Sequence, residues 1–322
     1  MKDKGRKVAY THDRQTPPSH MARSRRGKKG TGRRILLFLV TLVLCLALFC
    51  TAGFFLLRNH LFMDSDTASD SSVAVRTADV PAAFNCLIIQ TADGDTASRF
   101  WLTRFVADPG SITVTALPAE TMIDSAGRRD SLDGFLAYGG VAAVSQAVNS
   151  LLSISVDHTV RISPAQLESI VDQLGGVVYT VPRQLEEYDA QGNLIVALSP
   201  GRQSLTGAYI RQLFTYSGWE EGRSRQLTVQ QEVLAAFLNQ LFSSYNMGQA
   251  EANFLYLVNN SETTFSRADF DQWLPWFQKM AGSSPSAVKR AEGSFVVENG
   301  ASVFLMDQTQ RNSLGQAFGA TA

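Results

Sequence analysis

Arginine side chains are the groups in this sequence best suited to chemistry. A guanidinium is planar and binds two phosphate oxygens at once. Phosphoryl transfer needs little beyond positioning and charge neutralisation, so a cluster of arginines is a candidate phosphate site. The alternative is that each of these arginines is a solvated surface residue. The candidates are Arg99, Arg104, Arg128, Arg129, Arg211, Arg223 and Arg225.

Several other kinds of catalytic site are excluded by the residues present. The sequence has no H-E-x-x-H, C-x-x-C, G-x-S-x-G, G-x-G-x-x-G or Walker A motif, which excludes a metal site of the histidine and cysteine type. A Mg²⁺ site stays open, because it needs only one or two carboxylates. Cys45 and Cys50 lie in an apolar segment, which leaves Cys86 without a partner for a disulfide. Cys86 is predicted to be a small buried hydrophobe.

The charge of the chain is divided between two parts of opposite sign. Residues 1–34 hold 12 basic and 2 acidic residues, a net +10. The remainder holds 29 − 12 = 17 basic and 29 − 2 = 27 acidic residues, a net −10. Residues 35–57 carry no charge, and at ~1.5 Å per residue they span about 34 Å, enough for the hydrocarbon core of a bilayer. The sequence therefore predicts a transmembrane helix.

The flanks of the apolar segment predict its orientation. Basic residues before it favour a cytoplasmic N-terminus and an extracellular C-terminal part, in a single-pass protein of the plasma membrane. A cleaved signal peptide is the alternative, but the segment is longer than the usual apolar region and has no clean cleavage site. The basic residues are interpreted as contacts to anionic lipid, and no nucleic acid is expected.

The chain divides by composition into five segments. We predict a disordered basic cytoplasmic tail, a transmembrane helix, a polar linker, an extracellular domain and a C-terminal extension with helices and a β-hairpin. Their ranges are 1–34, 35–57, 58–83, 84–245 and 246–322.

Strand and helix patterns alternate through the extracellular domain. Strands are predicted at 86–89, 100–106, 112–117, 158–162 and 177–181, and helices at 141–152, 164–174 and 227–242. Further on, helical residues at 254–277 precede a hairpin over 295–297 and 303–305. The expected fold is an α/β (α+β) sandwich, with a central mixed β-sheet flanked by helices and preceded by a single transmembrane helix.

The order of several segments resembles a known family. They are Asn85–Ile89, Ile112–Thr121, Phe135–Gly140, Ile154–Pro182, Leu198–Gly207 and Gln230–Leu234. The most specific is Ile154–Pro182, a strand–helix–Gly-Gly–strand unit. Over about 84–245 the chain resembles the LytR-CpsA-Psr family, membrane-anchored enzymes that attach polyprenyl-pyrophosphate-linked glycopolymers to peptidoglycan in Gram-positive envelopes. The resemblance implies a polyprenyl lipid and a cell-wall glycopolymer as partners.

The charged site of that family is mostly absent here. Ala92 and Phe100 stand where the resemblance calls for aspartate. Cationic positions of the family are occupied by Ala119, Ser131, Thr215, Ser217, Gln226 and Val229. We therefore predict a catalytically impaired binding or scaffold protein of envelope assembly. The alternatives are a sensor that acts through the basic tail, or an active phosphotransferase with a rearranged site.

The rearranged site would have its own residues. Its candidate catalytic residues are Asp93, Arg99, Arg129, Arg211 and Arg225. Mg²⁺ is expected only for this alternative, and no other cofactor is predicted.

The resemblance also implies an apolar cavity for a polyprenyl tail. Candidate lining residues are Val144, Val148, Leu151, Ile170, Val171, Leu174, Leu234 and Phe237, all on apolar helix faces. Ordinary core packing explains the same faces equally well. Trp273 and Trp276 are candidates for stacking on a sugar, with a small hydrophobic cluster as the alternative.

Overall fold

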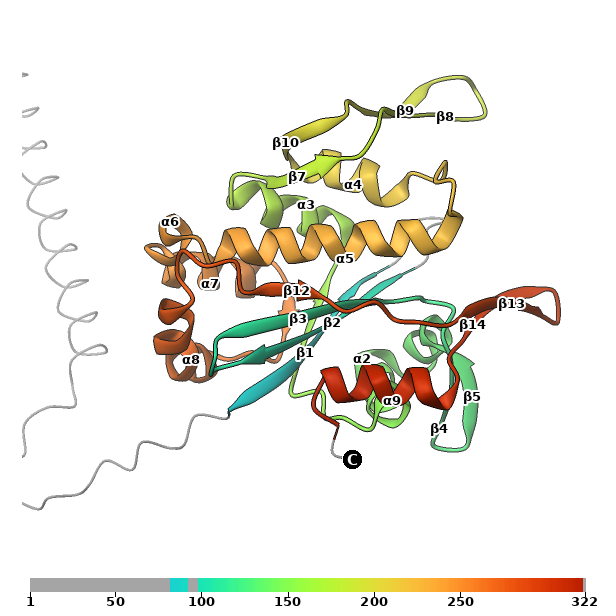
Figure 1. Ribbon diagram of the computed structural model, residues 1–322, viewed down its shortest axis with the longest axis horizontal. Helices are drawn as coiled ribbons and strands as arrows, with labels where there is room; N and C mark the ends of the chain where they lie inside the picture. The colour runs from blue at the N-terminus through green and yellow to red at the C-terminus, as the bar shows by residue number, and fades with distance from the viewer. Residues whose placement is uncertain (1–81, 92–97, 321–322) are drawn as a thin grey trace, which may run out of the picture. The chain divides into compact units, whose positions relative to one another are not determined.

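A mixed six-stranded β-sheet forms the centre of the computed structural model, which describes residues 82–91 and 98–320 (Figure 1). The strand order is β11-β6-β1-β2-β3-β12. The strands are β1 (Ala83–Gln90), β2 (Arg99–Val106), β3 (Ser111–Leu117), β6 (His158–Ile162), β11 (Glu262–Thr263) and β12 (Ser286–Val288). β2 runs antiparallel to β1 and β3, whereas β6 runs parallel to β1 and β12 parallel to β3. The predicted central mixed sheet is thus confirmed.

The strands place apolar side chains on both faces of the sheet, as the period of two requires. Leu87 and Ile89 of β1 belong to one hydrophobic cluster, with side chains from α2 and α9. Cys86 and Ile88 point to the opposite face, where they meet α5 and α8. Figure 1 shows β1, β2 and β3 between α5 on one side and the α2–α9 pair on the other. The fold is therefore a sandwich of helix, sheet and helix layers.

The layer on the first face is formed by α2 (Leu132–Leu152) and α9 (Gln308–Ala317). α2 begins at its N-cap Ser131 and is interrupted at Gly139 and Gly140, where the φ of Gly140 is 64°. Among the described residues, α2 alone is long and apolar enough by length and composition to cross a membrane. Its buried side chains pack in the cluster on the sheet, which is typical of a core helix.

The layer on the second face is larger. It consists of α3 (Pro164–Gln173), α4 (Gly207–Thr215), α5 (Gly222–Leu241), α6 (Ser244–Met247), α7 (Ala250–Asn259) and α8 (Arg267–Lys279). α3 has the predicted start, because the Ser163 hydroxyl accepts from the backbone N–H of Gln166 and Pro164 follows. Its predicted end is also confirmed, since Gly175 and Gly176 adopt positive φ.

Four two-stranded sheets lie outside the central sheet in the described chain. They pair β4 (Met122–Ser125) with β5 (Arg128–Ser131), β7 (Val177–Val181) with β10 (Gly201–Leu205), β8 (Leu185–Tyr188) with β9 (Leu194–Leu198), and β13 (Ser294–Glu298) with β14 (Ala301–Leu305). The last of these is the hairpin predicted near the C-terminus. The strands predicted at 100–106 and 112–117 are also present and pair as a hairpin, β2 with β3, within the central sheet.

Residues 246–320 differ from the expected separate extension. They supply β11 and β12 to the central sheet and α9 to the first helix layer. In the fold, 245 is therefore not a boundary, because strand pairing across it joins both parts to one core. The basic tail, the apolar segment and the linker lie outside the described residues.

Candidate ligand-binding site

An apolar cavity of about 220 Å³ lies between the second face of the sheet and the helices that cover it. Its lining comes from β1, β2, β6, β7 and from all the helices from α3 to α8, and includes Cys86, Trp101 and Phe214. Three polar side chains line it, namely Thr103, Asn246 and Asn253, and each donates a hydrogen bond to a backbone carbonyl. The cavity wall therefore offers contacts suited to a hydrocarbon chain.

The structure divides the predicted lining residues into two groups. Ile170, Val171, Leu234 and Phe237 line the cavity. Val144, Val148 and Leu151 do not, because α2 packs them against the opposite face of the sheet. Leu174 is buried at the end of α3, outside the lining. An apolar helix face predicts burial, but the layer in which it is buried depends on topology.

Trp273 and Trp276 lie on α8. Trp273 is 2% exposed, and its ring meets Phe84 edge-on at 4.6 Å between centroids. The Nζ of Lys279 lies 3.9 Å from the centre of the Trp276 ring. Trp273 closes the hydrophobic cluster, so stacking on a sugar is not proposed for it.

Arg99 lies next to the cavity wall, in contact with the lining residue Phe214. It is the first residue of β2, two positions before Trp101, and only 8% of its surface is exposed. Its Nη2 donates to the carbonyl of Phe214 at 3.3 Å, and its guanidinium lies 5.7 Å from the centre of the Phe214 ring. No carboxylate pairs with Arg99 among the described residues. Burial, and to a smaller extent the positive charges of Arg223 and Arg211, lowers the pKa of Arg99 to about 10.

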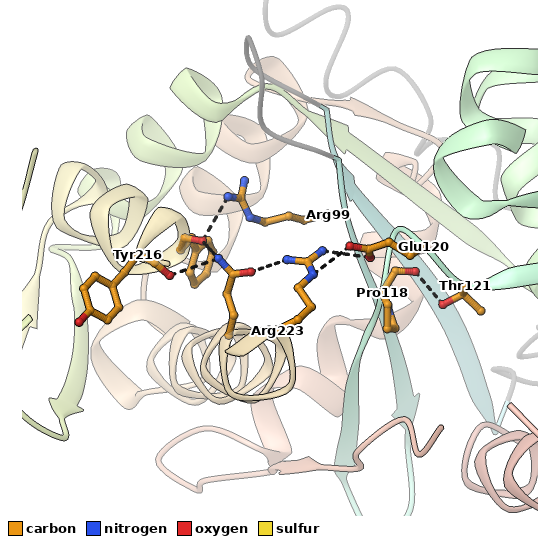
Figure 2. A network of polar contacts seen from close by, with 8 residues as sticks. Arg99, Pro118, Glu120, Thr121, Tyr216 and Arg223 are labelled. Carbon is orange, nitrogen blue, oxygen red and sulfur yellow. Dashed lines mark hydrogen bonds and ion pairs between the residues drawn. The ribbon is translucent and has the colours of Figure 1, made fainter. Parts of the chain in front are cut away.

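An ion pair between Glu120 and Arg223 lies beside Arg99 (Figure 2). Arg223 is in the first turn of α5, and Glu120 follows β3. The guanidinium donates twice to the carboxylate, from Nε to Oε1 at 3.2 Å and from Nη2 to Oε2 at 3.3 Å. Its Nη1 donates to the amide oxygen of Gln226, whose Nε2 donates to the Phe214 carbonyl at 3.0 Å. The ion pair and Arg99 therefore share one hydrogen-bonded network.

A tight turn positions Glu120. The Thr121 hydroxyl donates to the Pro118 carbonyl at 2.7 Å, and the Glu120 carbonyl accepts from the backbone N–H of Phe304 at 2.9 Å. Between them Ala119 is 3% exposed and packs in the cluster with α2. The turn thus points Glu120 toward Arg223 and position 119 into the core.

The remaining predicted cations are distributed over the domain. Arg211 pairs with Glu168 at 3.3 Å and is close enough to act on the pKa of Arg99. Arg225 pairs with Glu232 at 3.5 Å and lies 5.7 Å from the ring centre of Trp219.

Three other arginines lie with different partners. Arg129 pairs with Glu298 of the β13–β14 hairpin, Arg104 donates to the carbonyl of Phe318, and Arg128 pairs with Asp130. Arg99, Arg211 and Arg223 are therefore brought together, whereas these three are not. Asp93 lies outside the described residues.

The positions that depart from the family pattern have structural roles here. Phe100 and Val229 are 1% and 0% exposed and lie in hydrophobic clusters. Ser131 caps α2, and the Thr215 hydroxyl donates to the carbonyl of Arg211 at 3.0 Å. Gln226 supplies the neutral bridge described above. The resemblance marks position 226 only as a missing cation, and the role of Gln226 in this network follows from its partners in the fold.

The described residues contain no group of three or more potential metal ligands. Both oxygens of Glu120 accept hydrogen bonds from Arg223. A carboxylate engaged in this way does not fit the role of a Mg²⁺ ligand.

Three comparisons place the chain among known proteins. It is 28% identical over 120 residues to an uncharacterized protein of Staphylococcus aureus, covering 37% of this chain and 30% of that protein. It is 24% identical over 122 residues to the polyisoprenyl-teichoic acid–peptidoglycan teichoic acid transferase TagU of Bacillus licheniformis, covering 37% of this chain and 40% of TagU. Each match thus spans less than half of the curated relative.

The fold is similar to the crystal structure of TagV from B. subtilis, with a TM-score of 0.62 at 17% identity over 73% of this chain and 95% of that one. That identity shows the fold alone. The model of the LytR_cpsA_psr family matches residues 102–318, which is more than half of the chain. The chain therefore belongs to the LytR-CpsA-Psr family.

Proposed function

We propose that this protein binds a polyprenyl-phosphate carrier lipid, alone or joined to a cell-wall glycopolymer, as a binding or scaffold member of Gram-positive envelope assembly. The observation that carries the proposal is Arg99, a buried cation without a carboxylate partner among the described residues, in contact with Phe214 of the apolar cavity wall. A buried charge is costly unless it is paired, so the position favours an anionic ligand. A lipid phosphate supplies that anion and its tail fills the cavity.

We further propose that phosphotransfer by this protein is impaired. The pyrophosphate of a polyprenyl-linked glycopolymer carries about two negative charges, and removing one charge-assisted hydrogen bond to it costs ~1.5–3 kcal/mol. Loss of a single transition-state arginine costs ~10³–10⁵ in rate in phosphoryl transfer. Here the cations expected at 119 and 229 are buried apolar side chains, and Arg223 is neutralised by Glu120.

The same site supports one second candidate, an active glycopolymer–peptidoglycan phosphotransferase. The favouring observation is that Arg211 and Arg223 both act on the pKa of Arg99, so three cations share one neighbourhood. The two candidates differ in turnover and not in lipid binding.

The test has two parts. Full-length protein is purified in detergent, and the bound lipid is extracted and identified by mass spectrometry. The expected result is an isoprenoid phosphate in the wild type and its loss in Arg99→Gln. Transfer of a polyprenyl-pyrophosphate glycan to peptidoglycan is then measured with and without Mg²⁺, and none is expected. Turnover that Arg99→Ala abolishes would replace the first proposal by the second.

Membrane anchoring by residues 35–57, with the basic tail in the cytoplasm and residues 84–322 outside the plasma membrane, is part of the proposal. The support is the uncharged segment and its +10 flank, counted as 12 basic and 2 acidic residues. Protease added to intact cells is expected to degrade the domain and to spare an N-terminal tag. Protection of the domain would contradict this topology.

A further inference from the structure

We infer that one end of the domain rests on the surface of the bilayer, and that Tyr245, Trp276 and Lys279 contact the lipid headgroups there. The inference rests on the membrane anchoring that is part of the proposed function. It follows from the place where the chain enters the domain and from the exposed side chains at that end.

The chain enters the domain beside the turn between β2 and β3. The backbone N–H of Ala107 donates to the carbonyl of Ala82, immediately before β1 begins. Gly110 of the same turn packs against the side chain of Met280, the C-cap of α8. Figure 1 shows the start of β1 and α8 at the same end of the sheet. The chain therefore leads from the apolar segment 35–57 to this end of the domain.

α6 belongs to the same end. The backbone N–H of Gly282, two residues after the C-cap of α8, donates to the carbonyl of Phe242 at 2.9 Å. Gly282 also packs against the hydroxyl of Ser244, the first residue of α6. Tyr245 follows and is 76% exposed, so it contributes little to the core. Its ring is available to a partner outside the domain.

Trp276 and Lys279 form the neighbouring part of this surface. They lie about one turn apart near the end of α8, and the Nζ of Lys279 is 3.9 Å from the centre of the Trp276 ring. Tyrosine and tryptophan combine an apolar ring with one polar atom and are enriched where a bilayer meets water. A lysine side chain can lie along such a ring and extend its ammonium group to a phosphate. This composition fits a layer of lipid headgroups.

A small surface is sufficient because the domain is tethered. Residues 58–81 connect the apolar segment to the domain, and a short flexible linker gives an effective concentration on the order of millimolar. A stable interface between proteins buries about 800 Å² on each partner, which three side chains do not supply. The charges of Asp108 in the turn and Lys279 on α8 are opposite, so the contact should depend on the aromatic rings more than on lipid charge.

Docking by this end fixes the orientation of the Arg99 site. Ala83 of β1 pairs with Val106 of β2 at the docked end, and Gln90 pairs with Arg99 at the other. Seven steps along β1, at ~3.3 Å each, place Arg99 about 23 Å further from the headgroups.

A fluorescent label reports the contact. Cys45→Ser and Cys50→Ser leave Cys86, which is 7% exposed and is not labelled. Gln278→Cys then introduces a label on the exposed side of α8, and Tyr188→Cys introduces one on the β8–β9 hairpin in a second protein. Each full-length protein is reconstituted in phosphatidylcholine vesicles, with or without phosphatidylglycerol, that contain a lipid with a doxyl quencher near the headgroup.

The quencher is expected to act about twofold or more strongly on the label at 278 than on the label at 188, in both kinds of vesicle. Tyr245→Ser should lower the quenching at 278 to the level at 188. Tyr209→Ser is the matched control, since Tyr209 is also exposed, at 42%, but lies on α4. It should leave the quenching at 278 unchanged.

The outcomes separate this inference from the proposed anchoring, which flotation with the vesicles measures. Protein that does not float overturns the anchoring and the docking together. Floated protein with equal quenching at 278 and 188, or stronger quenching at 188, overturns the docking alone and needs no Tyr245 variant to fold. Unchanged quenching in folded Tyr245→Ser overturns the role of Tyr245. Quenching between labels that rises with protein density, without quenching by lipid, assigns the surface to a second copy and overturns the inference.

Discussion

Replacing Arg99 by methionine should stabilise the protein in the absence of ligand. The pKa of Arg99 falls well below the ordinary value of an arginine, to about 10, chiefly because of burial. At ~1.4 kcal/mol per pKa unit, the charge of Arg99 therefore lowers the free energy of unfolding by about 3 kcal/mol. Methionine has a similar length and carries no charge, so it relieves this cost.

Two losses reduce the gain. The contact of the guanidinium with the Phe214 ring is worth about 0.5–2 kcal/mol. The hydrogen bond to the Phe214 carbonyl is also removed, but Gln226 still donates to the same oxygen at 3.0 Å. The expected net stabilisation is therefore about 1–3 kcal/mol, obtained by removing the group that binds the ligand.

Thermal unfolding of the full-length protein in detergent measures the effect. In a domain of this size one kcal/mol shifts Tm by about 2–4 °C, so Arg99→Met should unfold at a temperature about 2–12 °C higher. Farnesyl phosphate should raise the Tm of wild type and leave that of Arg99→Met unchanged. The variant is thus expected to gain stability and lose the ligand response together.

The pH dependence has a definite sign. A lowered pKa means that the folded protein binds the Arg99 proton less tightly than the unfolded chain does, so the cost is fully present below pH 10. The cost declines as the pH rises from about 10 toward the ordinary pKa of an arginine, and the phosphate affinity of wild type should fall over the same range.

Arg211→Met is the control. Arg211 is half exposed and pairs with Glu168, so its replacement should change stability by at most about 1 kcal/mol, without a gain. A folded Arg99→Met protein that unfolds several degrees below wild type would refute the reasoning. It would mean that Arg99 has a net favourable environment without ligand.

Three further outcomes follow from the packing. Leu234 lines the cavity, so Leu234→Trp should fill part of it. Provided that the Tm of this variant stays near wild type, its affinity for farnesyl phosphate, measured by titration of the full-length protein in detergent, should fall about tenfold. Burial raises the pKa of the Cys86 thiol to about 12, so the thiol should resist a disulfide reagent at pH 8 until the protein unfolds. Because the thiol ionises more easily in the unfolded chain, the stability of the protein should decline from about pH 9 to 12. Tyr179→Phe removes the 2.8 Å hydrogen bond to Glu232 and should cost about 1 kcal/mol in chemical denaturation.

The parts of the fold that could be predicted from the sequence are those with local signals. Turn residues between β2 and β3, the Ser163–Pro164 start of α3 and its Gly-Gly end each constrain a few neighbouring residues. Pairing of β12 with β3 is not local, because about 170 residues separate the strands along the chain. For that reason the sequence pattern predicts an extension where the C-terminal segment in fact joins the sheet.

The candidate site shows the same limit. Comparison with family motifs identifies the missing charges at 119 and 229, since this requires only residue types in order. The contact of Arg99 with Phe214 and that of Glu120 with Arg223 join positions 115 and 103 residues apart. A sequence shows that such residues exist, but the turn after β3 and the start of α5 decide that they meet.

Lipid binding and phosphotransfer depend on different residues of this fold, and the two sets differ in their effect on stability. The cavity is lined by side chains such as Trp101, Val171 and Phe214, which also belong to the hydrophobic clusters on the sheet. Changing them removes buried apolar surface and destabilises the fold. The buried charge of Arg99, next to the cavity wall, instead carries a desolvation cost. Mutation of such a charge therefore costs little stability, whereas mutation of the apolar side chains that line the cavity destabilises the fold. This asymmetry gives a physical route by which a member of the family loses transfer and continues to bind the lipid.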